Sequence, residues 1–339
     1  MSRPRIAVVG CGAIARSFHV PALAKRPGIA ENLILVDRSM AHAQNLAAEF
    51  GVRVVRDDHR SVLGEVQGAI IAVPPQHHAS IAMDFLNSGI PVLCEKPLAM
   101  CADEARLLVR AFEHAGVPLA VNNQRRLLPS LQTAKELITS GTVGILKEIE
   151  IYDGAPFGWP LASGTLFGRS GGGRGILQDI GAHVLDTLCW WLGGTPQVTR
   201  YRDDSFGGTE AVARVEFEYE DCRGVVQLSW LSHLRNEFLI KGERLQVAGQ
   251  ITAWDHVNLM DPERAGRQKL KLKSKLPHSV ALRDHMIENF LDVVSGKADP
   301  LVPASHVIPS LEMIDACYEG RKRFIMPWMG VEGVEYAFE

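Results

Sequence analysis

The sequence predicts an α/β protein of two domains, a mostly parallel sheet domain in residues 1–124 and an α+β domain in residues 125–339. Three observations predict this. At 339 residues the chain is long for a single domain. Its first 124 residues alternate apolar, strand-like runs with helical stretches, an order that gives a parallel sheet with right-handed crossovers. After residue 125, alternating or β-branched runs dominate, which predicts a large, open and mostly antiparallel sheet.

The composition is that of an ordinary globular protein, with 46% apolar and 22% charged residues. A net charge of -3 predicts no nucleic-acid partner and no anionic membrane surface. No apolar run approaches the roughly 20 residues of a membrane helix, and no signal peptide is visible. The six cysteines form no C-x-x-C pair, which favours reduced thiols. We therefore expect a cytoplasmic protein.

The first predicted strand, residues 5–9, runs into the turn Gly-x-Gly-x-x-Ala and then into a helix. Gly10 permits the tight turn, Gly12 has no Cβ to keep a pyrophosphate from the backbone, and Ala15 lets the helix pack on the strand. The helix N-terminus presents free N–H groups to phosphates. This combination predicts a Rossmann dinucleotide-binding domain. Its expected contacts in this turn are Gly10, Gly12, Ala13 and Ile14.

The second predicted strand, residues 33–36, ends directly on Asp37. A carboxylate at this position accepts hydrogen bonds from the adenosine ribose hydroxyls and repels a 2′-phosphate, so it favours NAD. Arg38 tempers this prediction, because a guanidinium there stacks on adenine or binds that phosphate. NAD is the expected cofactor, and NADP stays open.

Three more unusual segments follow predicted strand ends, at residues 74–78, 95–97 and 122–126. In a parallel sheet, ligands bind beyond the carboxyl ends of the strands. We expect no metal at His77 and His78, since neighbouring residues at a helix start do not face one site and no third ligand is evident. The predicted cofactor contacts along this edge are Val73, Pro74, His78, Glu95, Lys96 and Pro97.

Within the second domain, a glycine-rich run at residues 171–175 leads into a predicted helix, residues 176–192. Apolar residues repeat at helical spacing on its core face. A second stripe carries polar groups, at steps of four, three and four residues. Its members are Asp179, His183, Asp186 and Trp190.

Together these motifs resemble the glucose–fructose oxidoreductase / inositol dehydrogenase / rhizopine catabolism oxidoreductase family, Gfo/Idh/MocA. The resemblance covers nearly the whole chain and rests on the glycine turn, Pro-Pro-x-x-His at 74–78, Glu-Lys-Pro at 95–97, Arg126, Gly-Thr-Val-Gly at 141–144 and Asp-Ile-Gly-Ala-His at 179–183. It implies a Rossmann domain followed by an α/β domain with a large open sheet. It also implies bound NAD(P), a cis Lys96–Pro97 bond, and hydride transfer on a sugar, cyclitol or related polyol.

In the family, the matching lysine, aspartate and histidine form the catalytic set, which implies those roles for Lys96, Asp179 and His183. The chemistry of the residues agrees. An ammonium stabilises a developing alkoxide, and an imidazole transfers protons near neutral pH. Asp179 would either bind the substrate or hold the imidazole. Arg126 and Trp159 are further candidates for substrate contacts, the tryptophan by stacking on a sugar ring.

Structural explanations compete with these roles. Lys96 could be a surface lysine before a turn, and Asp179 with His183 could be a helix-face pair worth about 0.2–0.5 kcal/mol. Two other functions also stay open, an NAD-dependent glycosidase of the same fold and a non-catalytic ligand sensor.

Few helical segments are available to cover the second sheet between residues 193 and 280. Apolar strand residues there, such as Val225, Leu228 and Trp230, would then leave an exposed apolar face, which usually marks an interface. We therefore expect a homodimer or homotetramer.

Overall fold

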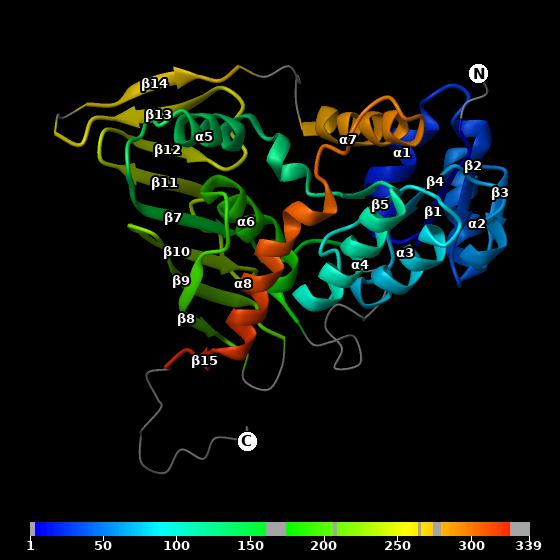
Figure 1. Ribbon diagram of the computed structural model, residues 1–339, viewed down its shortest axis with the longest axis horizontal. Helices are drawn as coiled ribbons and strands as arrows, with labels where there is room; N and C mark the ends of the chain where they lie inside the picture. The colour runs from blue at the N-terminus through cyan, green and yellow to red at the C-terminus, as the bar shows by residue number, and fades with distance from the viewer. Residues whose placement is uncertain (1–3, 161–173, 206–208, 264–265, 274–278, 326–339) are drawn as a thin grey trace, which may run out of the picture. The chain divides into compact units, whose positions relative to one another are not determined.

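The computed structural model describes residues 4–160, 174–205, 209–263, 266–273 and 279–325. The chain forms two compact units, which we describe one at a time (Figure 1). The first contains residues 1–124, 160–163 and 275–308, and the second contains residues 125–159, 164–274 and 309–339. A parallel sheet in the first and a mostly antiparallel sheet in the second confirm the predicted fold class.

In the part of the chain that the structure describes, the sheet of the first unit has six parallel strands in the order β3-β2-β1-β4-β5-β6. The strands β1, β2 and β4 are apolar, and every residue in them is buried, as expected for the centre of a sheet covered on both faces. The strand order reverses between β1 and β4, which is where ligands bind in such sheets. The strands are β1 Ile6–Val9, β2 Leu33–Val36, β3 Val54–Arg56, β4 Gly68–Ile71, β5 Val92–Cys94 and β6 Leu119–Val121.

Helices connect these strands. The stretch after β1 consists of a π-helical turn, η1 (Ala15–His19), and α1 (Val20–Ala24). Ser39 caps the next helix by accepting a hydrogen bond from His42 N, and Gly51 ends it in the left-handed region at φ 69°. The remaining helices that follow the strands are α2 Met40–Phe50, α3 His78–Leu86 and α4 Ala102–Ala115.

One stretch lies in a different unit from the predicted domain division of 1–124 and 125–339. Residues 275–308 group with the first unit. They contain α7 (Ser279–Val294), which contacts α1 and η1 and packs Phe290 on the parallel sheet. Nothing local in a late amphipathic helix indicates which of two sheets it will cover, so the sequence pattern did not reveal this return.

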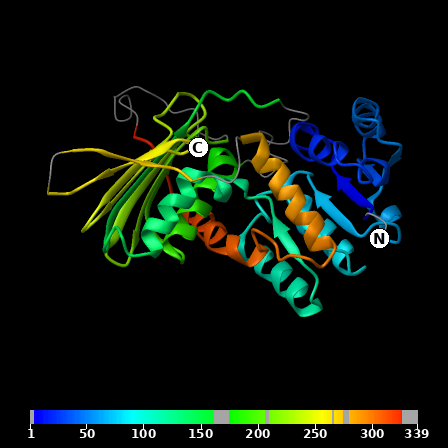
Figure 2. The same cartoon turned by 90° about the horizontal axis from the view of Figure 1, so that it is seen from above.

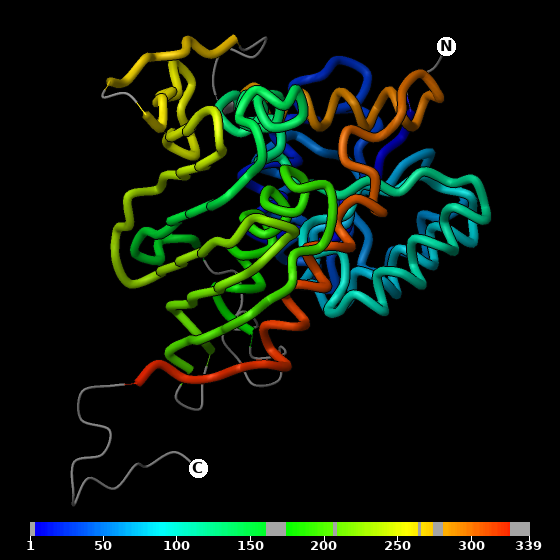
Figure 3. Tube along the Cα trace, turned by 60° about the vertical axis from the view of Figure 1, so that its left-hand side comes forward, coloured from blue at the N-terminus to red at the C-terminus, as the bar shows by residue number. Residues whose placement is uncertain are grey.

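Within the described residues, the sheet of the second unit has nine strands in the order β14-β13-β12-β11-β7-β10-β9-β8-β15. Among these strands, only β10 with β7 and β15 with β8 pair in parallel. The two edge strands, β14 in yellow and β15 in red, lie at opposite ends of the sheet (Figure 3). Five strands coincide with the alternating or β-branched runs that predict strands, at residues 146–152, 211–219, 224–230, 237–240 and 245–247. They are β7 Leu146–Gly154, β9 Val212–Tyr219, β10 Cys222–Ser229, β11 Glu237–Gly242 and β12 Gln246–Gln250. The pattern did not predict the other four, which are β8 Gln197–Asp203, β13 His256–Met260, β14 Gln268–Lys271 and β15 Arg321–Arg323.

The helices of this unit gather on one face of its sheet (Figure 2). α6 (Ile176–Leu192) packs on β10, β9 and β7, while α5 (Pro129–Thr139) contacts both α6 and β12. The third helix, α8 (Ile308–Glu319), meets α6 where Cys189 Sγ lies 3.5 Å from Met313 Sδ. None of the helices among the described residues is long and apolar enough to cross a membrane.

The expected apolar interface face needs a correction. Leu228 is fully buried beside α6, and Trp230 is 7% exposed and packs edge-on against Phe157. The opposite face of the sheet carries Val225, which is half-exposed, among charged groups such as Lys241 bonded to Glu148 and Glu150. Association into a dimer or tetramer remains a prediction that Leu228 and Trp230 do not support.

The packing of α7 on the first sheet predicts a compensating pair of substitutions. A Cβ at Gly68 would lie 2.5 Å from Val294 Cγ2. We expect Gly68→Ala to lower the free energy of unfolding by about 1–3 kcal/mol. In the Val294→Ala background the same change should cost much less, with a coupling of about 0.5–3 kcal/mol measured by urea denaturation of the four variants. Additive effects would show that α7 does not pack here.

Candidate functional site

The edge of the first sheet is defined by backbone hydrogen bonds that continue one residue past each strand. Gly10 N donates to Val36 O at 2.8 Å, and Ala72 N donates to Val9 O at 2.7 Å. Glu95 N donates to Ile71 O at 2.9 Å, and Asn122 N donates to Cys94 O at 2.8 Å. The residues that follow β1, β4, β5 and β6 are therefore held at one edge, as the sequence predicts.

The backbone at Gly10 passes so close to the end of β4 that no side chain fits there. Its φ is +97°, and a Cβ would lie 2.6 Å from Ala72 C and O and 2.8 Å from Val73 N. Beyond it, Ala13 and Ile14 are half-exposed, whereas Ala15 is fully buried against the sheet. This close crossing is the backbone cradle that a pyrophosphate requires.

Asp37 is tied to the glycine turn by its side chain. Its Oδ2 accepts a hydrogen bond from Cys11 N at 2.8 Å, and its Oδ1 accepts one from Ser39 N at 2.8 Å. Burial and then the charge of Asp37 raise the pKa of the Cys11 thiol to about 12, so this thiol stays neutral. Each carboxylate oxygen keeps a second lone pair, which fits the predicted contact with ribose hydroxyls. Arg38 beside it is exposed.

Glu95, the first residue after β5, belongs to a buried hydrogen-bond network. Its Oε1 is 2.8 Å from His19 Nε2 and accepts a hydrogen bond from Asn122 Nδ2 at 2.7 Å, while its Oε2 accepts one from Lys96 N at 3.2 Å. Burial acts to raise the pKa of Glu95, but His19, Asn122 and the Lys96 charge outweigh it and hold that pKa below its ordinary value. The carboxylate thus fixes the backbone of Lys96, a half-buried residue.

His78 links two segments of the same sheet edge through its ring nitrogens. Its side chain is fully buried, with Nδ1 2.8 Å from Pro97 O and Nε2 2.8 Å from Val73 O. Burial lowers the pKa of His78, against the effect of the two carbonyls. The ring therefore joins two of the segments predicted to bind the cofactor. The Lys96–Pro97 peptide bond is cis, which confirms the prediction from the resemblance.

The second unit carries Asp179 and His183 on α6. Both are half-exposed, one turn apart on the same helix. Asp179 N donates to Gly175 O at 3.1 Å, and Thr187 Oγ1 donates to His183 O at 2.9 Å. Lys96 belongs to the first unit, so its role beside these two residues stays a proposal.

Arg126 and Asp186 form a buried ion pair that holds the middle of α6. The guanidinium donates to both carboxylate oxygens, Nε to Oδ2 at 2.7 Å and Nη2 to Oδ1 at 2.6 Å. Arg126 is 6% exposed and also lies over the Trp190 ring, so its main contacts anchor the helix. Trp191 is a core residue, as its 1% exposure shows. A substrate contact for Arg126 remains a prediction.

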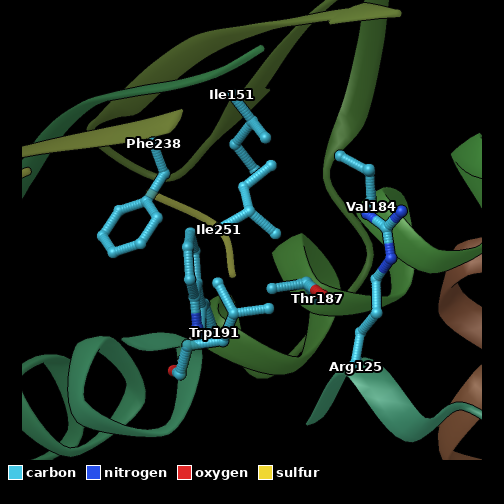
Figure 4. Close-up of a pocket in the computed structure, with 8 residues that line it drawn as sticks. Arg125, Ile151, Val184, Thr187, Trp191, Phe238 and Ile251 are labelled. Atoms are coloured by element: carbon cyan, nitrogen blue, oxygen red, sulfur yellow. Dashed lines mark hydrogen bonds between the residues drawn. The ribbon is translucent and has the colours of Figure 1, made fainter. Parts of the chain in front are cut away.

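A small pocket lies between α6 and the sheet of the second unit (Figure 4). It has room for about one water molecule, far less than a sugar needs. Arg125 at this pocket forms an ion pair with Asp153. The lining residues are Arg125, Leu131, Ile151, Val184, Thr187, Trp191, Phe238 and Ile251.

Trp159 is 47% exposed, which leaves its ring accessible for the stacking that the sequence predicts. Residues 161–173, which include Arg169 and the first three residues of the glycine run at 171–175, lie outside the described residues. Among the described residues, no group of three or more His, Cys, Asp or Glu is arranged to hold a metal ion.

Comparisons with known proteins agree with this geometry. Residues 4–123 match the family described as "Oxidoreductase family, NAD-binding Rossmann fold", and residues 131–250 match the GFO/IDH/MocA C-terminal domain. The chain belongs to the Gfo/Idh/MocA family. The first unit of this family member is thus an NAD-binding domain, as the sequence predicts.

Two relatives of known name match part of this Gfo/Idh/MocA chain. Rhizopine catabolism protein MocA of Rhizobium meliloti is 32% identical over 197 residues, which are 58% of this chain and 59% of the relative. D-glucoside 3-dehydrogenase of Escherichia coli (strain K12) is 30% identical over 213 residues, 60% of this chain and 57% of the relative. The match therefore covers less than two thirds of each relative.

The fold also matches solved structures of oxidoreductases. One from Agrobacterium radiobacter, in complex with NAD+, L-tartaric acid and magnesium, has a TM-score of 0.78 at 19% identity. The match covers 94% of this chain and 96% of that one. At this identity, the likeness shows the Gfo/Idh/MocA fold alone.

The sequence did not predict the partners of Glu95. His19, and Asn122 from the predicted segment 122–126, complete the Glu95 network from positions 76 and 27 residues away along the chain. A histidine inside an otherwise apolar helical stretch was the available signal for His19. Its partner could not be identified, because their proximity exists only in the folded sheet.

The buried network predicts an acid-sensitive loss of stability. Because the folded-state pKa of Glu95 is depressed, its charge contributes stability above the unfolded pKa near 4.3, and this contribution is lost as pH falls through the folded pKa. We expect Glu95→Gln to cost about 1.5–3 kcal/mol at neutral pH and less below about pH 4. Urea unfolding across pH measures this, with the exposed Glu113→Gln as control. A cost that stayed constant with pH would contradict an ionised Glu95.

Proposed function

We propose that this chain is an NAD-dependent oxidoreductase that transfers a hydride between nicotinamide and a secondary alcohol or ketone of a sugar, cyclitol or related polyol. The observation that carries the proposal is the backbone of Lys96, held by buried Glu95 at the sheet edge that also carries the Gly10 crossing and Asp37. The name of the D-glucoside 3-dehydrogenase relative supports the substrate class.

The proposed cofactor fits the first unit. The Gly10 crossing leaves the backbone open to a pyrophosphate, and Asp37 has lone pairs for ribose hydroxyls. NAD supplies the hydride acceptor, or the donor in the reverse direction. The protein then has to bind the substrate, stabilise charge on its oxygen and move one proton.

The Lys96 ammonium provides positive charge for an oxygen that becomes an alkoxide during the transfer. The His183 imidazole takes the hydroxyl proton during oxidation and returns it during reduction. Asp179, one turn earlier on α6, binds the substrate or orients the imidazole. The two roles of Asp179 differ in kinetics, because the first raises KM and the second lowers kcat.

The cofactor preference follows from Asp37. We expect NAD to bind more tightly than NADP, because the carboxylate would face a 2′-phosphate. Asp37→Ala should weaken NAD binding about tenfold or more by removing acceptors, and Asp37→Asn should separate charge from hydrogen bonding. Fluorescence titration of both cofactors measures this, with Arg38→Ala as the matched variant. Tighter NADP binding to the unchanged protein would mean that Arg38 governs the choice.

The catalytic set predicts a separation between turnover and cofactor binding. We expect His183→Ala and Lys96→Ala each to lower kcat by about 10²–10⁴-fold, the usual effect of losing such a group. NAD affinity should be unchanged in His183→Ala, because His183 belongs to the second unit, and somewhat weaker in Lys96→Ala. Steady-state kinetics on a panel of polyols and keto-sugars gives both constants, with the exposed His114→Ala as control.

Two outcomes would overturn this assignment. A folded His183→Ala enzyme with near-normal kcat from about pH 6 to pH 9 would leave the histidine as a structural residue of its helix. Turnover without net NADH formation would favour the glycosidase, which recycles its cofactor within each cycle.

A further inference from the structure

The backbone N–H groups at the start of α6 are hydrogen-bonded to a residue from elsewhere in the chain. The first N–H groups of a helix have no partner within it. Here Gly175 N and Leu177 N donate to Glu210 Oε1 at 2.8 and 3.4 Å, and Ile176 N donates to the Glu210 carbonyl at 2.9 Å. Three consecutive N–H groups thus converge on Glu210, which lies between β8 and β9.

The approach is so close that only glycine fits at the start of the helix. A Cβ on Gly175 would lie 2.0 Å from Glu210 O and 2.8 Å from Thr209 Cγ2. This explains the last glycine of the run that precedes α6. A carboxylate at a helix N-terminus also opposes the positive end of the helix dipole, which stabilises the first turn.

Glu210 is itself held by the C-terminal part of the chain. Its side chain is fully buried, with Tyr318 OH donating to Oε1 at 2.6 Å and Arg321 Nη2 donating to Oε2 at 3.0 Å. Arg321 also donates to Asp203, a second fully buried carboxylate. Arg174, the residue before Gly175, lies over the Tyr318 ring.

We propose that Glu210 is a positioning residue that fixes the first turns of α6 and thereby the side chains of Asp179 and His183. This inference rests on the proposed function of those two residues. Asp179 N makes the first hydrogen bond of the helix, to Gly175 O at 3.1 Å, so fraying at Gly175 would reach Asp179 directly. His183 lies one turn further along the same helix.

The experiment compares three substitutions of Glu210 in the full chain with one control variant. Glu210→Ala removes the acceptors of Gly175 N and Leu177 N. Glu210→Gln keeps one carbonyl oxygen for them, and Glu210→Asp is the milder alternative should the alanine variant not fold. Asp203→Asn is the matched control, because Asp203 accepts from Arg321 and Ser205 in the same buried cluster, whereas the N–H groups at the start of α6 donate to Glu210. Two measurements are needed, hydrogen–deuterium exchange of peptides spanning residues 175–185, and kcat with KM on the best substrate found.

We expect Glu210→Ala to speed exchange in the first turns of α6 and to lower kcat about ten- to a hundredfold, with NAD affinity unchanged. Glu210→Gln should restore most of kcat. Asp203→Asn should lower the melting temperature without changing kcat.

Unchanged exchange in α6 of the Glu210→Ala and Glu210→Asp variants would overturn the inference, whatever their activity. Faster exchange with normal kcat would also overturn it, provided that His183→Ala is inactive. If His183→Ala were active as well, the proposed function would be the statement that fails.

Discussion

The parallel direction of every strand in the first sheet is the constraint on which its candidate site depends. Parallel strands bring all carboxyl ends to one edge, and the backbone bonds from Gly10, Ala72, Glu95 and Asn122 extend that alignment one residue further. Segments that are 23 to 62 residues apart in sequence are thereby fixed side by side by backbone hydrogen bonds. The Gly10 crossing then leaves a strip of backbone at the point where the strand order reverses.

In the second unit, by contrast, the candidate residues lie on one helix. α6 has charged partners along its length. Glu210 lies at its N-terminus, Arg126 pairs with Asp186 in its middle, and Lys135 Nζ donates to Trp190 O at 2.6 Å near its C-terminus. A negative group at the start and a positive group at the end of a helix both interact favourably with its dipole. Burial, and then the charge of Arg126, lowers the pKa of Lys135.

Local features of this chain could be read from its sequence, and features that depend on distant partners could not. The glycine turn, Asp37 after β2 and the Ser39 cap with Gly51 each need only neighbouring residues to be recognised. Two of the missed strands, β14 and β15, are the edges of the sheet and consist mainly of charged residues, so they carry little apolar alternation. The return of residues 275–308 to the first unit, and the partners of Glu95 and Glu210, appear only in the folded chain.

Glu95 and Glu210 show how buried carboxylates are used next to candidate catalytic residues. Each accepts hydrogen bonds from backbone N–H groups at or near such a residue, Lys96 N for the first and the N-terminal turn of α6 for the second. Burial of a charge is costly unless donors surround it, and both carboxylates have donors on both oxygens. A carboxylate with its oxygens so engaged, and with little or no exposed surface, is a poor acceptor for a substrate proton. The proton transfer in the proposed reaction is therefore assigned to a half-exposed group, and His183 on α6 is half-exposed.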